Sequence, residues 1–485
     1  MNNINSTSFH TIDEIFNPAS IAVVGASPEI GSIGYHYLQY LLGPGYEGQI
    51  YAVNPRYPKI LDLPTYSCLE DIPGNVEYVI SCISAGGVID LIKQSGAKKV
   101  KAVHLFTARF SETGDPAAKK LELEILEEAR KQKVRLIGPN CMGIYNPKAG
   151  IHFNYDLPTI AGNIGGIIQS GGLAGDFVRF GALRGVSFSK VVSFGNGLDL
   201  NECDFLDYLA DDSDTRVIFL YLEGVQDGPR FISLLKQIAS HKPIIILKGG
   251  RTFAGCKAAA SHTASIAGAA DIFSQVLKQH NVIRAKDLTE MIDLAVGFSM
   301  PAPVKNKNIT MVGGGGGKCV LSSDEAEEAG LCVPALPIQV VAEIAEKEPE
   351  MAQWIGNPVD FSIMYGRKIS PPLMLDLLAN SPEIDLLFCN ITDDNPFGGD
   401  FWVKWIQNEI DQYLRIASLG KQQIIVIICN PQLTQSAMNN WRWITLAKQR
   451  ERLIKAGIPV FSSIKRASRA IYKIADYYEK KKTLK

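Results

Sequence analysis

The sequence lacks the features that would tie the chain to a membrane, a secretory route or a disulfide framework. Its first residues, MNNINSTSFHTIDEIF, contain neither a basic start nor an apolar run, so they do not resemble a secretory signal. No stretch reaches the roughly 18 apolar residues of a spanning helix. The nine cysteines show no CxxC or Cys/His ligand spacing, which argues against a disulfide framework or a zinc site. We therefore expect a soluble, cytoplasmic protein without a metal site and without membrane contact.

An excess of charge of one sign is also missing. The 49 Lys and Arg residues nearly balance the 50 Asp and Glu residues, so no overall field would draw the chain to nucleic acid. The chain has 485 residues, of which 46% are hydrophobic. At roughly 100–200 residues per domain, this length predicts several domains, each with an ample core.

The sequence does contain a repeated alternation of short β-branched runs with helical, charge-bearing segments, which predicts parallel sheets covered by helices. The alternation pauses at 146–157, and a Pro-punctuated linker follows at 301–308. We therefore expect an α/β chain of three consecutive domains, at 10–148, 149–300 and 305–470. The expected strands are 20–24, 49–53, 78–83, 102–106 and 135–137, then 166–168, 190–193, 217–222 and 243–248, then 309–312, 386–390, 423–429 and 459–461.

The first expected strand runs into the turn GASPEIGSIG and a helix. Glycines at such a turn let the backbone approach a phosphate, and the helix N-terminus favours an anion. The spacing is not GxGxxG, so the turn also fits any tight connection of an α/β domain. The candidate ligand contacts here are Gly25, Ser27, Gly31 and Gly34.

The second expected strand ends in Ala-Val-Asn54-Pro-Arg56. A site for NAD usually has an acidic residue at this point. An arginine instead suits a phosphate on the ribose, as in CoA or NADP, although a surface arginine after a turn is equally compatible. After the third strand, small residues that include Ser84 and Ala85 would let a ligand lie across the strand ends.

The segment IGPNCMG at 137–143 resembles the IGPNC-G signature of the succinyl-CoA synthetase α subunit and of ADP-forming acetyl-CoA synthetases. Together with the opening strand and the VNP turn, it resembles their Rossmann-like CoA-binding domain. The resemblance implies CoA rather than NADP, with Asn140 and Cys141 near its thiol end. We do not assign Cys141 as a nucleophile, because no His or acidic partner is evident nearby. One departure is Arg109, where relatives usually have glycine.

The segment KGGRTFAGCKAAASHTASIAG, 248–268, surrounds one histidine with small side chains, and we expect a slim loop from which His262 reaches out. It resembles the KGGRT…A-SHTGSLAG segment of nucleoside-diphosphate-forming acyl-CoA synthetases, in which the histidine attacks an acyl phosphate and becomes phosphohistidine. The resemblance implies that His262 is catalytic. Ala264 and Ile266 replace the usual Gly and Leu, and neither change removes a reactive group.

Two further segments would assist this histidine. IQSGGLAG, after an expected strand, resembles the SQSGALG-type segment whose helix N-terminus faces the phosphate, and it implies phosphate contacts at Ser170, Gly171 and Gly172. Glu223, at another strand end, matches the family glutamate that orients the histidine. Glu202 is a weaker candidate for the same task, in a segment where Gly197 replaces the lysine of many relatives.

The third domain opens with a strand that enters five glycines. A Walker A loop is excluded, because Lys318 is followed by cysteine. The segment resembles the T-AGGPG turn of the flavodoxin-like domain in the same ligases, which implies phosphate contacts at Gly315 and Gly316. IGNPVD, 355–360, matches their GNPVD motif. The acidic pair that follows, Asp393 and Asp394, fits either a site edge or a solvated loop.

The order CoA-binding, phosphohistidine and flavodoxin-like domain resembles an α subunit of the two-chain form, since no ATP-grasp segment is evident. The resemblance implies an enzyme that interconverts acyl-CoA, ADP and phosphate with a small carboxylic acid, CoA and ATP. It also implies an ATP-grasp β subunit that binds ADP or ATP with Mg²⁺, in a hetero-oligomer, although a homodimer stays open.

Two alternatives remain open from the sequence. A CoA-binding regulatory protein that has lost turnover would account for the changes at Arg109, Gly197 and Ala264. An NADP-dependent oxidoreductase would account for the first domain alone, but it leaves SHTASIAG and GNPVD unexplained. The sequence does not identify the acyl group.

Overall fold

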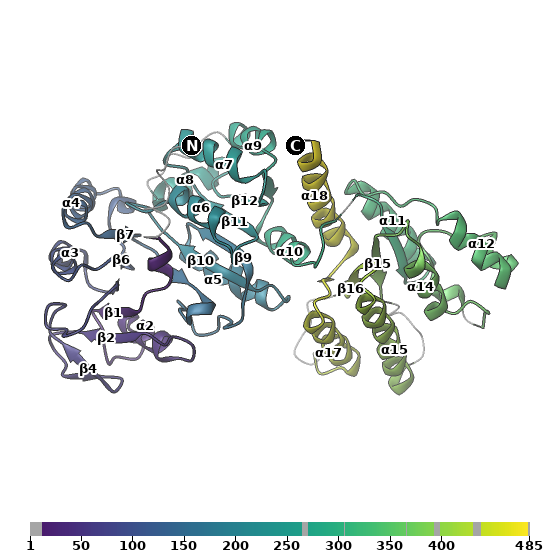
Figure 1. Cartoon of the computed structure of the whole chain (residues 1–485), viewed down its shortest axis with the longest axis horizontal. Coiled ribbons are helices and arrows are strands. Elements are labelled where there is room, and N and C mark those ends of the chain that lie inside the picture. The colour runs from purple at the N-terminus through teal and green to yellow at the C-terminus, as the bar shows by residue number, and fades with distance from the viewer. Residues whose placement is uncertain are drawn as a thin grey trace. The chain divides into compact units, whose positions relative to one another are not determined.

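The computed structural model describes residues 12–263, 270–304, 306–364, 366–391, 398–429 and 438–483, and leaves the side chains of 260–263 and 270 undescribed. The chain forms two compact units, Met1–Met291 and Ile292–Lys485. In Figure 1 the colour follows the chain from the purple strands of the first sheet to the yellow C-terminal helix. The fold is α/β throughout, as the sequence predicts, with two sheets in the first unit and one in the second.

The first sheet has seven strands in the order β3-β4-β2-β1-β5-β6-β7. All neighbours pair in parallel except β3 and β4. The strands are β1 (Ser20–Val24), β2 (Gln49–Val53), β3 (Lys59–Ile60), β4 (Leu63–Tyr66), β5 (Tyr78–Ser81), β6 (Ala102–Leu105) and β7 (Arg135–Ile137), and the helices are α2 (Ile33–Leu42), α3 (Val88–Ala97) and α4 (Pro116–Gln132). The strand order reverses at β1, and ligands of such sheets bind at the carboxyl ends beside this point.

The second sheet has the order β13-β12-β11-β9-β10-β8. Its strands are β8 (Gly143–Tyr145), β9 (Ala161–Ile168), β10 (Phe188–Ser193), β11 (Val217–Leu222), β12 (Ile244–Lys248) and β13 (Ile283–Ala285), and its helices are α5 (Gly171–Ala182), α6 (Glu202–Asp211), α7 (Gly228–Ile238), α8 (Phe253–Thr263) and α9 (Ala270–Gln279). The expected strands are present, extended at the start of β9 and β10.

Two expectations for this region need correction. The chain enters the second sheet at β8, which pairs antiparallel with β10, so the sheet is mixed rather than parallel. The expected loop around position 262 is wrong up to Thr263, because α8 occupies Phe253–Thr263. Alanines have the highest helix propensity, so small residues favoured a helix there. The rest of that segment, 264–269, lies outside the described residues.

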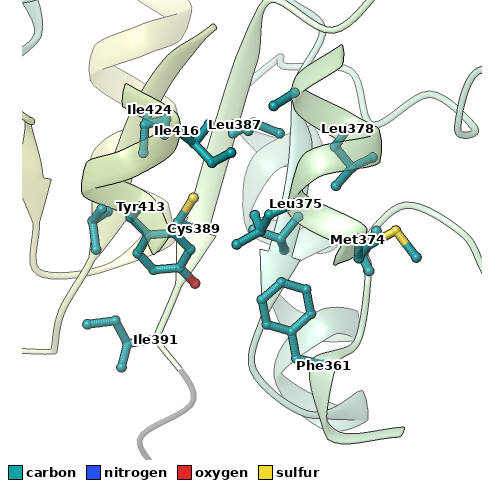
Figure 2. Packing of buried hydrophobic residues seen from close by; sticks show 14 of the residues in the cluster. Phe361, Met374, Leu375, Leu378, Leu387, Cys389, Ile391, Tyr413, Ile416 and Ile424 are labelled. Carbon is teal, nitrogen blue, oxygen red and sulfur yellow. The ribbon is translucent and has the colours of Figure 1, made fainter. Parts of the chain in front are cut away.

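The second unit has a parallel sheet in the order β14-β15-β16-β17. The strands are β14 (Thr310–Gly313), β15 (Leu386–Asn390), β16 (Gln423–Ile427) and β17 (Val460–Phe461), and the longer helices are α10 (Leu288–Phe298, which begins in the first unit), α11 (Gly316–Glu328), α12 (Ile338–Lys347), α14 (Pro371–Asn380), α15 (Gly399–Ser418), α17 (Trp441–Lys455) and α18 (Ile464–Thr483). Figure 2 shows part of the buried core, to which β15 contributes Cys389, α15 contributes Tyr413 and α14 contributes Leu375. None of the described helices is long and apolar enough to cross a membrane.

A buried ion pair ties α18 to α10 within the second unit. The carboxylate of Asp293, whose side chain is 4% exposed, accepts bonds of 2.8 Å from Nε and from a terminal nitrogen of Arg466. Removing one partner of such a pair leaves a buried charge, which costs about 3 kcal/mol.

We therefore expect Arg466→Met to lower the free energy of unfolding of the second unit by about 3 kcal/mol in urea titrations. The matched control is Arg415→Met, since the pair of Arg415 with Asp376 is exposed and such pairs contribute less than about 1 kcal/mol. Equal losses in the two variants would contradict the assignment of Arg466 as a structural anchor.

Candidate functional site

The turn between β1 and α2 is built so that the helix begins against the strand end. Gly25 has φ +86°, and a Cβ there would lie 2.9 Å from the carbonyl oxygen of Cys82. A Cβ on Gly34 would lie 2.1 Å from the carbonyl oxygen of Gly25. Ser32 caps α2 by accepting a 3.3 Å bond from the amide of Tyr35. Close contact of backbone with backbone therefore requires glycine at both positions.

A cavity of about 630 Å³ opens at the carboxyl ends of β1, β2 and β5. Four of the predicted contacts line it, namely Gly25, Asn54, Arg56 and Ser84. The cavity lining does not include the other predicted contacts of this domain, which are Ser27, Gly31, Gly34, Ala85, Asn140 and Cys141. The side chain of Ser27 accepts a 3.1 Å bond from the amide of Glu29, and Gly31 has φ +100° with open space around it.

Some polar groups of this cavity bond the protein itself, whereas others can bind a ligand. Asn54 donates a 2.6 Å bond to the carbonyl of Ala26 and accepts a 2.9 Å bond from the amide of Arg56. Its amide group therefore ties the end of β2 to the glycine turn. Arg56 lines the cavity, is exposed and has no ion pair with another described side chain, so its charge is available to an anion.

Several lining residues could not have been found from the sequence. Ser67 and Cys68 follow β4, a short strand that no pattern predicted, and Asp90 and Gln94 lie one turn apart on α3. Gln94 donates a 3.0 Å bond to Asp90. They reach the cavity because the sheet places β4 and α3 beside β2 and β5, which only the tertiary pairing determines.

Hydrogen bonds to buried groups hold the IGPNC segment in place. The peptide before Pro139 is cis, and Asn140 has φ +59° and donates its amide to the carbonyl of Thr107 at 2.9 Å. Cys141 is 4% exposed, and burial raises the pKa of its thiol. A buried thiol with a raised pKa is a poor nucleophile, which agrees with the expectation that Cys141 is not the nucleophile.

His104 lies under this segment. Its Nε2 is 3.1 Å from the carbonyl oxygen of Cys141, the ring is 1% exposed, and burial lowers the pKa of His104 to about 4. The neutral ring therefore donates to that carbonyl at neutral pH.

The lowered pKa has a consequence for acid stability. The folded chain binds the His104 proton more weakly than the unfolded chain, so this stabilisation is complete above pH 6.5 and is lost as pH falls towards 4. We expect the first unit to lose about 3 kcal/mol through His104 over that interval, and we expect His104→Gln to show a flatter pH dependence of unfolding by circular dichroism. Parallel curves for both chains would contradict the assignment.

The N-terminus of α5 is a second helix end that can bind an anion. Ser170 caps it by accepting a 3.4 Å bond from the amide of Leu173. A Cβ on Gly171 would lie 2.7 Å from the side chain of Met142, whereas a Cβ on Gly172 would meet nothing within 4 Å. Gly171 is thus required by packing against the IGPNC segment, and Gly172 leaves the helix end open.

Glu223 lies next to this helix start, directly after β11. Its amide donates a 2.7 Å bond to Oε1 of Gln169, the residue before Ser170, and its Oε1 accepts a 3.1 Å bond from the hydroxyl of Tyr221. Its Oε2 is buried and has no hydrogen-bond partner among the described residues. Lys248 donates to the backbone carbonyls of Glu223 and Gly249 at 2.7 and 2.6 Å. A buried acceptor without a donor is costly, so this oxygen marks a place for a ligand or a further side chain.

Glu202, the weaker candidate, is the first residue of α6 and forms a structural contact. It is 1% exposed, its Oε1 accepts a 2.8 Å bond from the amide of Gln226, and burial raises the pKa of its carboxyl. Gln226 in turn donates to the carbonyls of Asn196 and Gly197. Gly197 has φ +65°, a conformation that favours glycine and gives a physical reason for the absence of lysine there.

The helix that contains position 262 packs against the first domain. α8 contacts the 3₁₀ turn Ser111–Thr113, which follows Arg109. Glu112 in this turn accepts 2.5 Å and 2.8 Å bonds from the amide of Arg109 and from the side chain of Asn196. Arg109 has φ +75°, so the position suits the glycine that relatives carry. The side chain of His262 lies outside the described residues.

The second unit has its own glycine turn. A Cβ on Gly313 would lie 2.0 Å from the carbonyl oxygen of Asn390, Gly315 is the N-cap of α11, and α11 begins at Gly316. Asn357 of the GNPVD motif accepts a 2.9 Å bond from the amide of Met311. Asp360 accepts hydrogen bonds from the amide and the hydroxyl of Ser362. The motif therefore braces the strand that leads into the turn. Asp393 and Asp394 lie outside the described residues.

Comparison with known protein families agrees with this geometry. Residues 19–147 match a family described as a CoA binding domain, and residues 161–298 match one described as a succinyl-CoA ligase like flavodoxin domain. The first unit is therefore a CoA-binding module joined to a ligase-type flavodoxin domain.

Individual relatives identify the family more specifically than the two domain matches do. The α subunits of ADP-forming acetate–CoA ligases II and I of Pyrococcus furiosus are each 36% identical to this chain, over 78% of it and over 81% and 83% of their own length. The chain belongs to the family of ADP-forming acyl-CoA ligases of the succinyl-CoA synthetase superfamily, in which these relatives are α subunits. Among solved structures, acetyl-coenzyme A synthetase 1 of Candidatus Korarchaeum cryptofilum, in complex with phosphate and ADP, is 26% identical with a TM-score of 0.81, covering 97% of each chain.

Proposed function

We propose that this chain is the α-type subunit of an ADP-forming acyl-CoA ligase that works through a phosphohistidine at His262. The observation that carries the proposal is the buried Oε2 of Glu223, which lacks a donor among the described residues and lies beside the open N-terminus of α5. An imidazole N–H is a donor of the right kind for this oxygen, and a carboxylate so placed selects the tautomer that attacks and stabilises the charged product. This function is favoured over that of a CoA-binding regulatory protein, which would not require such a carboxylate.

The first half of the reaction consists of an acyl transfer from CoA to phosphate and a phosphoryl transfer to His262. An oxygen of phosphate attacks the thioester carbonyl of acyl-CoA, the C–S bond breaks, and CoA leaves as the thiol after protonation. The free nitrogen of His262 then attacks phosphorus, the bond from phosphorus to the bridging oxygen breaks, and the carboxylate leaves with that oxygen. The amides of Ser170–Gly172 at the start of α5 stabilise the phosphoryl charge. Catalysis here depends on positioning and charge stabilisation.

The second half of the reaction needs a nucleotide site on a partner. The relatives in Pyrococcus furiosus are named as α subunits, and an ATP-grasp β subunit that binds ADP with Mg²⁺ would accept the phosphoryl group from His262. Gly315 and Gly316, at the start of α11, would provide a phosphate contact within the second unit.

Arg56 would recognise the ribose phosphate of CoA, because this residue lines the cavity without an ion partner among the described side chains. We expect Arg56→Ala to weaken CoA binding about 10- to 100-fold in calorimetry, as loss of one charge-assisted hydrogen-bond pair does. Dephospho-CoA, which lacks that phosphate, should bind both chains equally. An equal loss for both ligands would show that Arg56 acts on the fold rather than on the phosphate.

The phosphohistidine itself can be measured directly. Incubation of the purified chain with phosphate and short, branched and aromatic acyl-CoAs should give an acid-labile, alkali-stable phosphate on His262, which mass spectrometry can map. We expect none in His262→Ala and a rate about 100-fold lower in Glu223→Gln. If CoA binds but no acyl-CoA yields the modification, the regulatory CoA-binding protein is the better account.

A further inference from the structure

We infer that Tyr221 is a positioning residue for phosphoryl transfer, which holds one oxygen of Glu223 and leaves the other for the imidazole of His262. This inference rests on the proposed function. Tyr221 is the fifth of six residues of β11, and Glu223 directly follows the strand. Residues two apart on an extended chain share a face, and the Tyr221 hydroxyl accordingly donates a 3.1 Å bond to Oε1 of Glu223.

The backbone of Glu223 is fixed independently of this bond. Its amide donates to Gln169 at 2.7 Å, and its carbonyl accepts from Lys248 at 2.7 Å. The freedom that remains is rotation of the side chain, and the Tyr221 hydroxyl restricts it. Oε1 is satisfied by that hydroxyl, while Oε2 is buried without a partner among the described residues. The two oxygens of one carboxylate are therefore unequal, and only one is available to a reacting group.

Gly249 provides the room for this pair. A Cβ at position 249 would lie 2.6 Å from the hydroxyl oxygen of Tyr221 and 3.3 Å from Cγ of Glu223. A methyl group there would displace the hydroxyl from the carboxylate. The small residue at the end of β12 thus serves the Tyr221–Glu223 pair in addition to the turn.

The hydroxyl stays a donor under all working conditions. Burial raises the pKa of Tyr221, and the charge of Glu223 and the hydrogen bond to it raise it further. A phenol with a raised pKa keeps its proton through the physiological range. Tyr221 therefore remains a hydrogen-bond donor to Glu223, and its effect passes through the orientation of that carboxylate.

The test measures single-turnover phosphorylation of His262 from saturating acyl-CoA and phosphate. We expect Tyr221→Phe, which keeps the ring and loses the hydroxyl, to phosphorylate about 10-fold more slowly, as a misplaced catalytic group does. The half-saturating concentrations of acyl-CoA and phosphate should not change. Tyr145→Phe is the matched control, because it removes a buried hydroxyl that donates to the carbonyl of Pro158 elsewhere in the same sheet.

Two further arms separate positioning from general damage to the fold. In the double variant Tyr221→Phe with Glu223→Gln, the rate should fall no further than in Glu223→Gln alone, because Tyr221 acts through that carboxylate. Gly249→Ala should reproduce the loss seen in Tyr221→Phe. Gly228→Ala, where the added methyl group meets nothing within 4 Å, should keep the wild-type rate.

The outcomes distinguish this inference from the function on which it rests. A wild-type chain that is phosphorylated at the same rate as Tyr221→Phe retains the proposed function and overturns the positioning role. Multiplicative losses in the double variant would also overturn it, since Tyr221 would then act independently of Glu223. A wild-type chain that is never phosphorylated would refute the proposed function itself.

Discussion

The close approach of backbone to backbone at glycine turns is the constraint on which the rest of this structure depends. At Gly34 in the first unit and Gly313 in the second, a methyl group would lie 2.1 and 2.0 Å from a carbonyl oxygen. Only glycine allows the following helix to start so close to the strand end. Each such turn places the N-terminus of a helix at the edge where parallel strands end, and a helix N-terminus in that position can receive a phosphate.

The charge of Glu223 is a second constraint on the site. A phosphate bound at a helix start would repel a nearby carboxylate, so a carboxylate kept there must have a role that outweighs this repulsion. Glu223 is held by Gln169 through its amide, by Lys248 through its carbonyl and by Tyr221 through one carboxylate oxygen. The remaining oxygen has no partner among the described residues. In the proposed mechanism, that oxygen is reserved for an imidazole that carries a phosphoryl group.

Sequence patterns predicted the α/β class and the main strands well, because buried parallel strands are short β-branched runs such as SIAVV of β1. They did not predict β8, since three residues beside a cis-proline turn carry no periodic signal. The loop expected at 253–263 is a helix, because small residues suit both. Arg56 and Glu223 could be selected from strand ends, whereas Ser67 and Gln94 reach the cavity only through strand pairing and helix packing. Tyr221 lies two residues before Glu223 on the same strand face, but no sequence motif distinguished it from the other residues of β11. Asn54 was selected as a ligand contact, but both ends of its amide bond the chain itself.

The path of oxygen tests the central claim most directly. If phosphate attacks the thioester and His262 then removes the phosphoryl group, the bridging oxygen stays with the acid. Incubation of the chain with acyl-CoA and ¹⁸O-labelled phosphate should therefore give free acid that carries one ¹⁸O atom, detected by mass spectrometry, with one labelled acid formed per phosphorylated chain. Acid that carries only oxygen from water would mean simple thioester hydrolysis, and it would contradict the acyl phosphate and phosphohistidine route.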